Sequence, residues 1–403
     1  MRIRYLLLHA YGTGGTIRTV INQANSMVAV GHDVQLVSVL RRRDEPAFPL
    51  DPRVGITTIV DQRDGAEDAR PDHGPLARYR AWSRARLAQQ QPKVIPQGEF
   101  GIDYFDRHVE KEVARYLRGL SAGILVTTRP ALNILAARYA PASVTRVGQE
   151  HMNLSTHRKD VRAAIARYYP RLDAIAVLTH RDREEYEQLL PGTRIVRIPN
   201  AIHSLDQEPA DHTAKVAVAA GRLVPQKGFD MLIPAFEQVV EHHPDWQLRI
   251  YGAGKKKAEL RALIEEHHLY NNVFLMGHTS HLDDELAKAS FYVLSSRFEG
   301  LPMVMIEAMA HALPVVSFDC PTGPADVLTD GTEGFLVPAQ DVAGLAHAMG
   351  RLMADESLRA KMGTAAVATA RNFSEAVVRP QWEELFAELT GADAADTPEA
   401  VGR

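Results

Sequence analysis

Short apolar runs alternate with helical segments along this chain, and the alternation occurs twice, on either side of a polar stretch. The first round opens with a strand-like run over residues 3–8, a glycine turn, a helical segment over 17–30 and a second run over 34–40. This β-α-β order is typical of a parallel sheet covered by helices. The polar stretch, residues 201–214, resembles a domain linker. We therefore expect two α/β domains.

The remaining apolar runs divide the chain further. Residues 41–100 show no sustained period and are predicted to be mostly loop and insertion, before a helix over 104–120. Further strands are predicted at 124–127, 144–147, 174–178, 195–198, 216–220, 247–251, 273–276, 292–294, 314–317 and 335–337. The expected divisions are a first domain over 1–205, a second over 206–374, a final amphipathic helix over 375–390 and a disordered tail over 391–403.

Composition narrows the class of protein. A net charge of −4 exerts no overall attraction for nucleic acid, so none is expected as a partner. The single cysteine, Cys320, excludes an internal disulfide, and we expect it to be a small buried residue rather than a nucleophile. No stretch approaches the roughly 20 apolar residues that cross a bilayer. We expect a cytoplasmic protein. A peripheral contact at the inner face of the membrane stays open, because residues 76–87 combine arginines with aromatic residues and could form a basic helix on an anionic membrane. A solvated helical insertion or an acceptor-binding loop is the alternative.

Two cations flank the loop that follows the strand over 216–220. Arg222 comes directly after the strand, and Lys227 lies just before a helical run. An arginine fork binds two oxygens while a lysine neutralises a second charge, a combination that suits a diphosphate. A solvated surface pair is the alternative that this loop alone leaves open.

The segment over residues 295–302 follows another strand and runs into a helix. Pro302 suits the first helical position, which leaves the amides around Gly300, Leu301 and Met303 at the positive end of the helix dipole. Glu307 lies about 7.5 Å further along the helix axis, where it suits the ribose hydroxyls of a nucleotide. Glu299, in the loop, suits the transferred sugar. Because the neighbours of Glu307 are almost all apolar, we expect it to be buried with a polar partner.

In combination these motifs resemble the retaining glycosyltransferases of family four. The resemblance rests on Glu299 and Glu307 within SSRFEGLPMVMIEAMAHALPVV, on AGRLVPQKGFD around Arg222, and on YGAG, IPNAIH and the N-terminal GTGG. It implies a GT-B fold of two facing Rossmann-like domains with a cleft between them, and a C-terminal helix that crosses back to the first domain. The first domain is then acceptor-binding and the second binds the nucleotide sugar.

The resemblance also assigns roles by position. Arg222, Lys227, Gly300 and Leu301 bind the donor diphosphate, together with Gly14 and Gly15 of the first domain. Glu307 binds the ribose, and His151 and Glu299 are the catalytic residues beside the sugar. The nucleobase is expected near Gly254, His278 and Thr279.

The implied reaction is transfer of a hexose or N-acetylhexosamine, with retention, from a nucleotide-diphosphate sugar, expected to be a UDP-sugar, to a hydroxyl acceptor. Synthesis of cell-envelope polysaccharide, teichoic acid or glycolipid would use such a step. No Asp-x-Asp pair occurs in the chain, so neither a metal nor another cofactor is expected, with protein cations in the metal's usual place.

Three rival functions stay open. A non-hydrolysing nucleotide-sugar epimerase has the same architecture, but the pair of glutamates favours a transferase. An NAD-dependent oxidoreductase would have a third glycine in its first turn, where this chain has Ile17. A nucleotide-sugar binding protein without turnover is the third. The sequence leaves the oligomeric state open.

Overall fold

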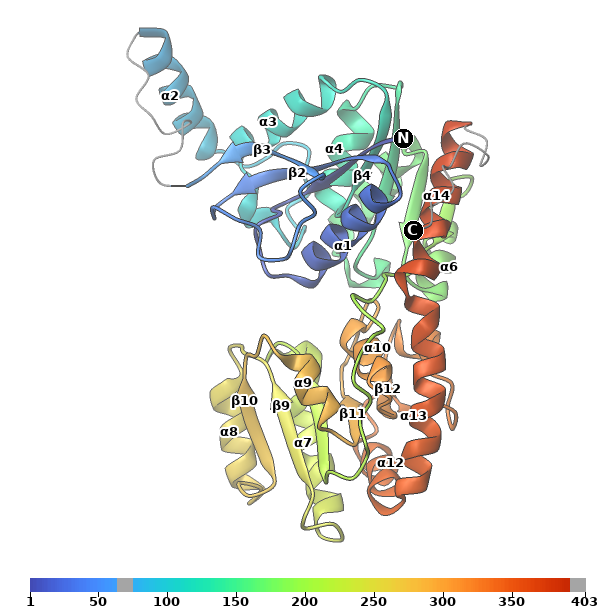
Figure 1. Cartoon of the computed structure of the whole chain (residues 1–403). Coiled ribbons are helices and arrows are strands. Elements are labelled where there is room, and N and C mark those ends of the chain that lie inside the picture. The colour runs from blue at the N-terminus through green and yellow to red at the C-terminus, as the bar shows by residue number, and fades with distance from the viewer. Residues whose placement is uncertain (64–74, 392–403) are drawn as a thin grey trace. The chain divides into compact units, whose positions relative to one another are not determined.

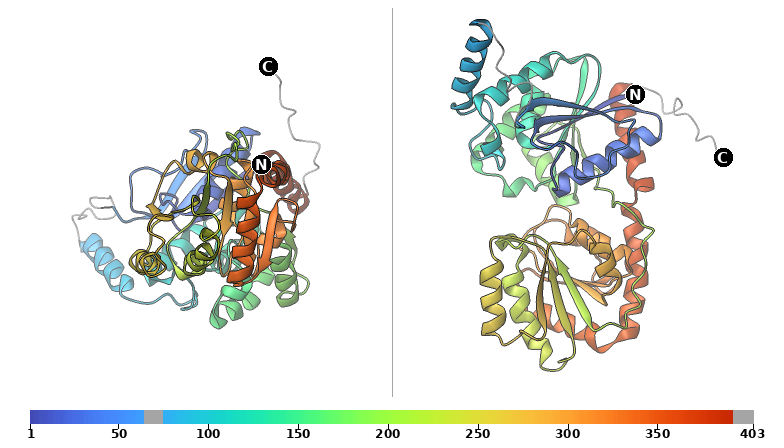
Figure 2. Two further views of the ribbon diagram at one scale, coloured as in Figure 1. Left: turned by 90° about the horizontal axis from the view of Figure 1, so that it is seen from below. Right: turned by 60° about the vertical axis from the view of Figure 1, so that its left-hand side comes forward.

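The computed structural model describes residues 1–63 and 75–391, which form two compact units. One unit comprises residues 1–201 together with the chain from residue 379, and the other comprises residues 202–378. Each is a parallel sheet covered by helices (Figures 1 and 2). The sequence predicts divisions at 205/206 and 374/375, and the compact units divide at 201/202 and 378/379.

The first unit contains a seven-stranded parallel sheet in the order β3-β2-β1-β4-β5-β6-β7 among its described residues. The strands are β1 (Arg2–Leu7), β2 (Asp33–Arg41), β3 (Gly55–Asp61), β4 (Gly123–Thr127), β5 (Val144–Gln149), β6 (Ala174–Val177) and β7 (Ile195–Arg197). The helices are α1 (Gly15–Ala29), α2 (Pro75–Ala88), α3 (Arg107–Arg118), α4 (Pro130–Tyr139), α5 (Lys159–Tyr168) and α6 (His180–Leu189), with short 3₁₀ turns η2 (Ile102–Tyr104), η3 (Leu154–Thr156) and η4 (Tyr169–Arg171).

One element contradicts the prediction of mostly loop and insertion over residues 41–100, because the strand β3 pairs in parallel with β2. The helix α2 covers the stretch 76–87, for which a basic helix or a helical insertion was considered, and it contacts α3 (Figure 1). The β3 sequence, GITTIVD, is rich in β-branched residues, but it lies at the sheet edge and its side chains, most of them partly exposed, do not alternate between apolar and polar. Within α2, the side chains of Tyr79 and Trp82 are exposed. The side chains of residues 76–78 and of Arg80, which belong to the proposed basic stretch, lie outside the described part of the structure, and so does the whole of residues 64–74.

The second unit contains a six-stranded parallel sheet in the order β10-β9-β8-β11-β12-β13. The strands are β8 (Val216–Ala220), β9 (Gln247–Tyr251), β10 (Val273–Gly277), β11 (Phe291–Leu294), β12 (Val315–Asp319) and β13 (Gly334–Pro338). The helices are α7 (Phe229–Val240), α8 (Lys257–Glu266), α9 (Leu282–Ala287), α10 (Met303–Ala310), α11 (Pro324–Val327), α12 (Val342–Ala354) and α13 (Glu356–Ala370), with turns η5 (Pro225–Lys227) and η6 (Arg371–Phe373). The last helix, α14 (Glu375–Thr390), begins in this unit and has most of its residues in the first.

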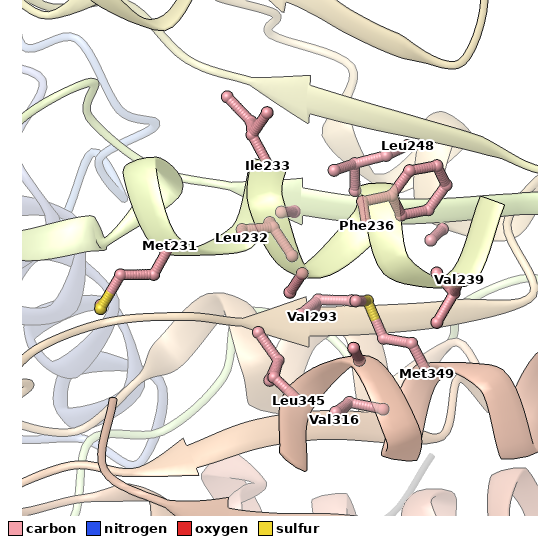
Figure 3. Packing of buried hydrophobic residues seen from close by; sticks show 14 of the residues in the cluster. Met231, Leu232, Ile233, Phe236, Val239, Leu248, Val293, Val316, Leu345 and Met349 are labelled. Carbon is pink, nitrogen blue, oxygen red and sulfur yellow. The ribbon is translucent and has the colours of Figure 1, made fainter. Parts of the chain in front are cut away.

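The core of the second unit explains why its strands read as continuous apolar runs. Helices α7 and α12 pack together over one face of the sheet, where Phe236 and Met349 meet Leu248 and Val293 (Figure 3). Helices cover a doubly wound sheet on both faces, so its strands need no polar side. Such a sheet leaves the carboxyl ends of its strands, and the loops that follow them, as the edge available to ligands.

The expected linker over residues 201–214 is packed rather than free. The Ala210 amide donates to the His311 carbonyl at 2.8 Å, and Arg359 donates to the His212 carbonyl at 2.8 Å. Ala210 and His212 are buried. The polar composition of the segment is satisfied by backbone contacts with the second unit, which composition alone does not reveal.

The last helix continues from one unit into the other, as the resemblance implied. From residue 379 onward its residues group with the first unit. Trp382 and Phe386 are buried, and Glu388 forms an ion pair with Arg194 at 2.9 Å. The tail predicted to be disordered, residues 392–403, lies outside the described residues. Within the described chain, no helix is long and apolar enough to span a membrane.

Candidate functional site

Three loops meet at the carboxyl edge of the second sheet, and glycines allow them to approach. Gly228 has a φ of +64°, and a Cβ there would lie 1.9 Å from the Ser295 carbonyl oxygen. The Ser295 hydroxyl donates to the Lys227 carbonyl at 2.9 Å, which ties the loop after β8 to the loop after β11. The Thr322 hydroxyl, after β12, donates to the Glu299 carbonyl at 2.5 Å. The three strands are neighbours in the sheet, so their ends form one rigid surface.

The side chains of Lys227 and Glu299 meet on this surface. Lys227 Nζ donates to Glu299 Oε1 at 2.6 Å, and the Ser296 hydroxyl donates to the same oxygen at 2.5 Å. Both ionic side chains are largely buried, with 18% and 7% of their surface exposed. Arg222 is exposed and forms no ion pair or hydrogen bond with another described side chain. Two predicted diphosphate ligands therefore lie on one loop, one held by a carboxylate and the other facing solvent.

The start of α10 differs in detail from the prediction. Pro302, with a ψ of 78°, caps the helix instead of occupying its first position, and the Met303 amide donates to the Leu301 carbonyl at 2.9 Å. The amide of Met303 is therefore engaged in a tight turn. Among the described residues, no backbone or side-chain acceptor takes the amides of Gly300 and Leu301. These two donors lie at the positive end of the helix, where an anion is favoured.

Glu307 lies on α10 with 11% of its side chain exposed, and it has the polar partner that its apolar neighbours require. Nδ1 of His203 lies 3.4 Å from its Oε1. Nε2 of the same histidine lies 3.1 Å from Asp283 Oδ2. His203 belongs to the segment before β8, so this contact joins residues about a hundred positions apart. Glu307 is oriented by a histidine that itself lies between two carboxylates.

The residues assigned to the nucleobase follow β9 and β10 at the same edge. Gly254 follows β9, and a Cβ there would lie 2.3 Å from the Leu223 carbonyl oxygen, so packing alone requires this glycine. The Gly252 amide donates to the Gly277 carbonyl at 2.7 Å, which ties the two strand ends together. His278 is exposed, and the Thr279 hydroxyl accepts from the His281 amide.

In the first unit, Gly14 and Gly15 lie at the start of α1. Gly14 caps the helix with an extended backbone, and no acidic residue lies in the first turn. A Cβ placed on Gly15 would have no protein atom within 4 Å. Protein packing therefore does not explain this glycine, and the helix start has room for a ligand.

His151 follows β5 in the same unit. Burial lowers its pKa to about 4, so the imidazole is neutral at physiological pH. Its Nε2 is buried and has no hydrogen-bond partner among the described residues. A buried nitrogen without a partner is uncommon, and it is a candidate for contact with a ligand.

A buried polar cluster that the sequence did not predict lies beside His151. Glu150 Oε1 accepts from Asn133 Nδ2 at 2.7 Å and from the Tyr169 hydroxyl. Burial raises the pKa of Glu150 to about 8, against the lowering effect of these two hydrogen bonds. His157 Nε2 lies 3.9 Å from the second oxygen of Glu150. No sequence spacing signals this cluster, because its members come from separate elements.

The structure thus brings the predicted residues together in two groups. On the second unit, one sheet edge carries Arg222, Lys227, Glu299, Gly300 and Leu301, with Glu307 on the helix that follows and Gly254, His278 and Thr279 on the neighbouring strand ends. On the first unit are Gly14, Gly15 and His151. Ser296, Thr322 and His203 were not assigned roles, although Ser296 and His203 lie within the motifs SSRFEG and IPNAIH. Cys320 is buried, and burial together with Glu299 raises its pKa to about 12, which excludes a reactive thiolate.

Comparison with known proteins places this geometry in context. Residues 203–369, most of the second unit, match the family model described as glycosyl transferases group 1. A mutant of S. aureus TarM in complex with fondaparinux, alpha-GlcNAc-glycerol and UDP superposes with a TM-score of 0.75, at 17% identity over 96% of this chain and 99% of that chain. The fold is GT-B.

Two curated relatives are similar in sequence. An exopolysaccharide phosphotransferase of Streptomyces coelicolor is 36% identical over 96% of this chain. The chain spans only 41% of that relative's length. A poly(glycerol-phosphate) alpha-glucosyltransferase of Bacillus subtilis is 31% identical over 54% of this chain and 32% of the relative.

Proposed function

We propose, from the group 1 glycosyl transferase match of the second unit, that this chain transfers a hexose or N-acetylhexosamine from a UDP-sugar to a hydroxyl acceptor. The observation that carries the proposal is the sheet edge where the Lys227–Glu299 pair lies beside the open amides of Gly300 and Leu301. Cations and helix-start amides suit a diphosphate, and a carboxylate beside them suits sugar hydroxyls. UDP in the complex of TarM supports the choice of base.

The proposed reaction proceeds with retention, as in family four. The bond between the anomeric carbon and the diphosphate oxygen breaks, the acceptor oxygen bonds to that carbon on the same face, and the hydroxyl proton passes to the departing diphosphate. Negative charge grows on the leaving group in the transition state. Arg222, Lys227 and the amides of Gly300 and Leu301 stabilise that charge electrostatically.

The remaining roles follow by position. Glu307, oriented by His203, accepts hydrogen bonds from the ribose hydroxyls. Gly254, His278 and Thr279 line the base, and Gly14 and Gly15 leave room at the start of α1. We assign His151 to the sugar beside the anomeric carbon. Since its imidazole is neutral, it acts there as a hydrogen-bonding group and not as a cation.

A polymer phosphotransferase is a second candidate, because one relative has that name. That relative is more than twice as long as this chain, and the segment matched here includes a group 1 glycosyl transferase domain. We therefore prefer a glycosyltransferase to a polymer phosphotransferase. Cell-envelope polysaccharides, teichoic acids and glycolipids are the acceptor classes we propose, at a cytoplasmic location with peripheral membrane contact as an alternative.

The test is incubation with a panel of nucleotide sugars, measuring nucleotide release and the sugar product. Donor-dependent release of UDP, reduced at least roughly 100-fold in Arg222→Ala and Lys227→Ala, is expected. Release of free sugar-phosphate polymer, or interconversion of the nucleotide sugar without release, would replace this proposal with a phosphotransferase or an epimerase.

We further propose that turnover needs no metal, because the protein cations neutralise the leaving diphosphate. Activity after dialysis against EDTA should equal activity before it. Loss of turnover that Mg²⁺ or Mn²⁺ restores would refute this part and leave the donor assignment intact.

A further inference from the structure

A second set of charged and aromatic side chains lies on the first unit, at the carboxyl ends of strands that neighbour one another in the order β2-β1-β4-β5. Four arginines define what we call the cationic edge: Arg42 and Arg43, which follow β2, Arg129, which follows β4, and Arg162, in the first turn of α5. We propose that the cationic edge binds the acceptor and that the acceptor is a negatively charged glycan. This inference rests on the proposed sugar transfer and specifies its acceptor class.

The cationic edge is one continuous surface around the segment 100–104. The ring of His9, which follows β1, lies 5.9 Å from the ring of Tyr104. Arg42 lies over the same tyrosine, with its Cζ 5.0 Å from the ring centre. On the other side, Gly101 packs directly on Arg129, since a Cβ there would lie 2.3 Å from a guanidinium nitrogen.

The surface continues to the loop after β5. The ring of Phe100 lies 6.4 Å from the ring of His157. Burial and, after it, the charges of Arg129 and Arg162 lower the pKa of His157 to about 4. Two arginines from different elements therefore act on one imidazole.

The arginines also produce a positive electrostatic field around His9, at the other end of the cationic edge. The pKa of His9 is lowered first by burial and then by the charges of Arg129, Arg42 and Arg43. Both histidines consequently favour the neutral form, and neither competes with the arginines for an anion.

Most of these charges have no carboxylate partner. Arg42 donates to the neutral side chain of Gln62 at 2.8 Å, and among the described residues neither Arg43 nor Arg162 forms an ion pair. Arg129 is the exception, because it is held by the buried Glu99 at 2.8 and 2.9 Å. Three guanidinium groups are thus available to a ligand.

Acidic side chains near the cationic edge offset part of this charge. Asp44 shares Arg63 with Asp61, at 2.5 and 2.7 Å, and Asp160 accepts the Gly98 amide at 2.7 Å. Asp103 lies in η2, has no cationic partner within the described chain, and is the acid that opposes the edge directly.

Exposed aromatic rings add the second half of the recognition. Phe100 is 61% exposed and Tyr104 is 37% exposed, which is unusual for large rings unless they meet a ligand. Flat rings suit the apolar faces of sugars, and guanidinium forks suit carboxylates or phosphates. An acidic glycan presents both features, whereas a neutral glycan would leave the arginines unused.

The test compares matched acceptors on the full chain with its active UDP-sugar. One arm uses a glucuronate-containing oligosaccharide and its carboxyl-reduced neutral form; a second arm uses a glycerol-phosphate oligomer, which distinguishes carboxylate from phosphate as the charge read. We expect kcat/KM for at least one charged acceptor to exceed that for the neutral form roughly ten-fold, and the preference to fall with added NaCl.

Variants locate the effect. Arg42→Gln and Arg162→Gln should each bring the charged-to-neutral ratio close to one, while Arg42→Lys should keep part of it. Arg118→Gln is the matched control, because Arg118 is an exposed arginine in the last turn of α3, before β4 begins and so at the opposite edge of the sheet. Thermal melting establishes that each variant is folded.

Calorimetric titration of the same oligosaccharides measures binding without turnover. Binding of a charged glycan that Arg42→Gln weakens would support the inference even if no UDP were released, an outcome that would refute the proposed function alone. Equal use and equal binding of charged and neutral forms would overturn the inference. A rise in donor KM in Arg42→Gln, with the acceptor ratio unchanged, would reassign the cationic edge to the donor.

Discussion

The carboxylate of Glu299 receives hydrogen bonds from Lys227 and Ser296 on one oxygen, while Glu307 contacts His203. The two glutamates therefore occupy different electrostatic surroundings on the same sheet edge. Glu299, held beside the Lys227 ammonium group, suits an interaction that strengthens as positive charge develops on the sugar in the transition state. Glu307, oriented by His203, suits hydrogen bonds from hydroxyl groups whose charge does not change. Their effects on the kinetics should differ.

Glu299→Gln should lower kcat roughly 100-fold, because it is assigned to the sugar beside the reacting carbon. Glu307→Gln should instead raise the donor KM roughly ten-fold with a small change in kcat, because ribose hydroxyls keep their charge during the reaction. Steady-state kinetics with saturating acceptor and variable donor separate the two. Glu259→Gln, an exposed glutamate on α8, is the control. Identical, near-wild-type kinetics in both variants would show that the paired carboxylates are structural.

Glu150 gives a prediction about stability. Its pKa is about 8 in the fold, against 4.5 for an ordinary glutamate side chain, so the folded state holds one more proton than the unfolded state between these values. Stability therefore falls as pH rises through this window, by up to about 1.4 kcal/mol per pH unit. Glu150→Gln mimics the neutral acid and does not titrate. Its free energy of unfolding, relative to that of the wild type, should therefore rise by up to about 1.4 kcal/mol per pH unit from about pH 5 to 8. Urea denaturation measures both free energies of unfolding. A difference between variant and wild type that stays constant with pH would contradict the raised pKa of Glu150.

At this scale, motifs could predict Arg222, Lys227, Glu299 and Glu307 as candidate residues, because strand-end loops bring them to one edge. The partner of Glu307 could be predicted only as a polar group. His203 and Asp283 are distant in sequence, and local spacing carries no information on such contacts.

Among the elements, α1 makes a sharp distinction between packing and function. A Cβ on Gly15 would meet no protein atom within 4 Å, and the φ of this residue is not positive. Alanine there should leave the melting temperature unchanged or raise it slightly, since alanine favours the helix.

If the start of α1 approaches the donor, Gly15→Ala should nevertheless raise the donor KM several-fold, because the added methyl group occupies the space left for the ligand. Kinetics and thermal melting on the same preparation give both values. Unchanged kinetics would mean that the glycine serves neither packing nor donor binding.

The elements themselves were predicted unevenly. Long periodic segments such as α1 and buried runs such as β8 follow from side-chain spacing alone. The edge strand β3 was missed because its stability comes from pairing with β2, a contact between chain segments that alternation does not encode.

At the scale of the whole chain, the last helix, α14, has residues in both units. Its apolar stripe, Val378, Trp382, Leu385 and Phe386, has helical spacing, so the helix over 375–390 could be predicted. The stripe does not specify what it packs against. Its residues from 379 group with the first unit, about 180 positions after that unit's last strand. The family resemblance predicts this return to the first unit, whereas the side-chain pattern does not.

Removal of this helix should destabilise the first unit selectively. Truncating a buried Phe or Trp costs about 3–5 kcal/mol, and Phe386 is fully buried, so Phe386→Ala alone removes a large part of a domain's net stability of about 5–15 kcal/mol. A chain ending at Val378 loses Trp382, Leu385 and Phe386 together, which should unfold the first unit at room temperature while the second unit keeps its own melting transition. Calorimetry resolves the two transitions, and a chain ending at Gly391 is the control that keeps the helix. If the chain ending at Val378 melted like the full chain, the last helix would contribute no stability to the first unit, and its burial there would have no energetic consequence.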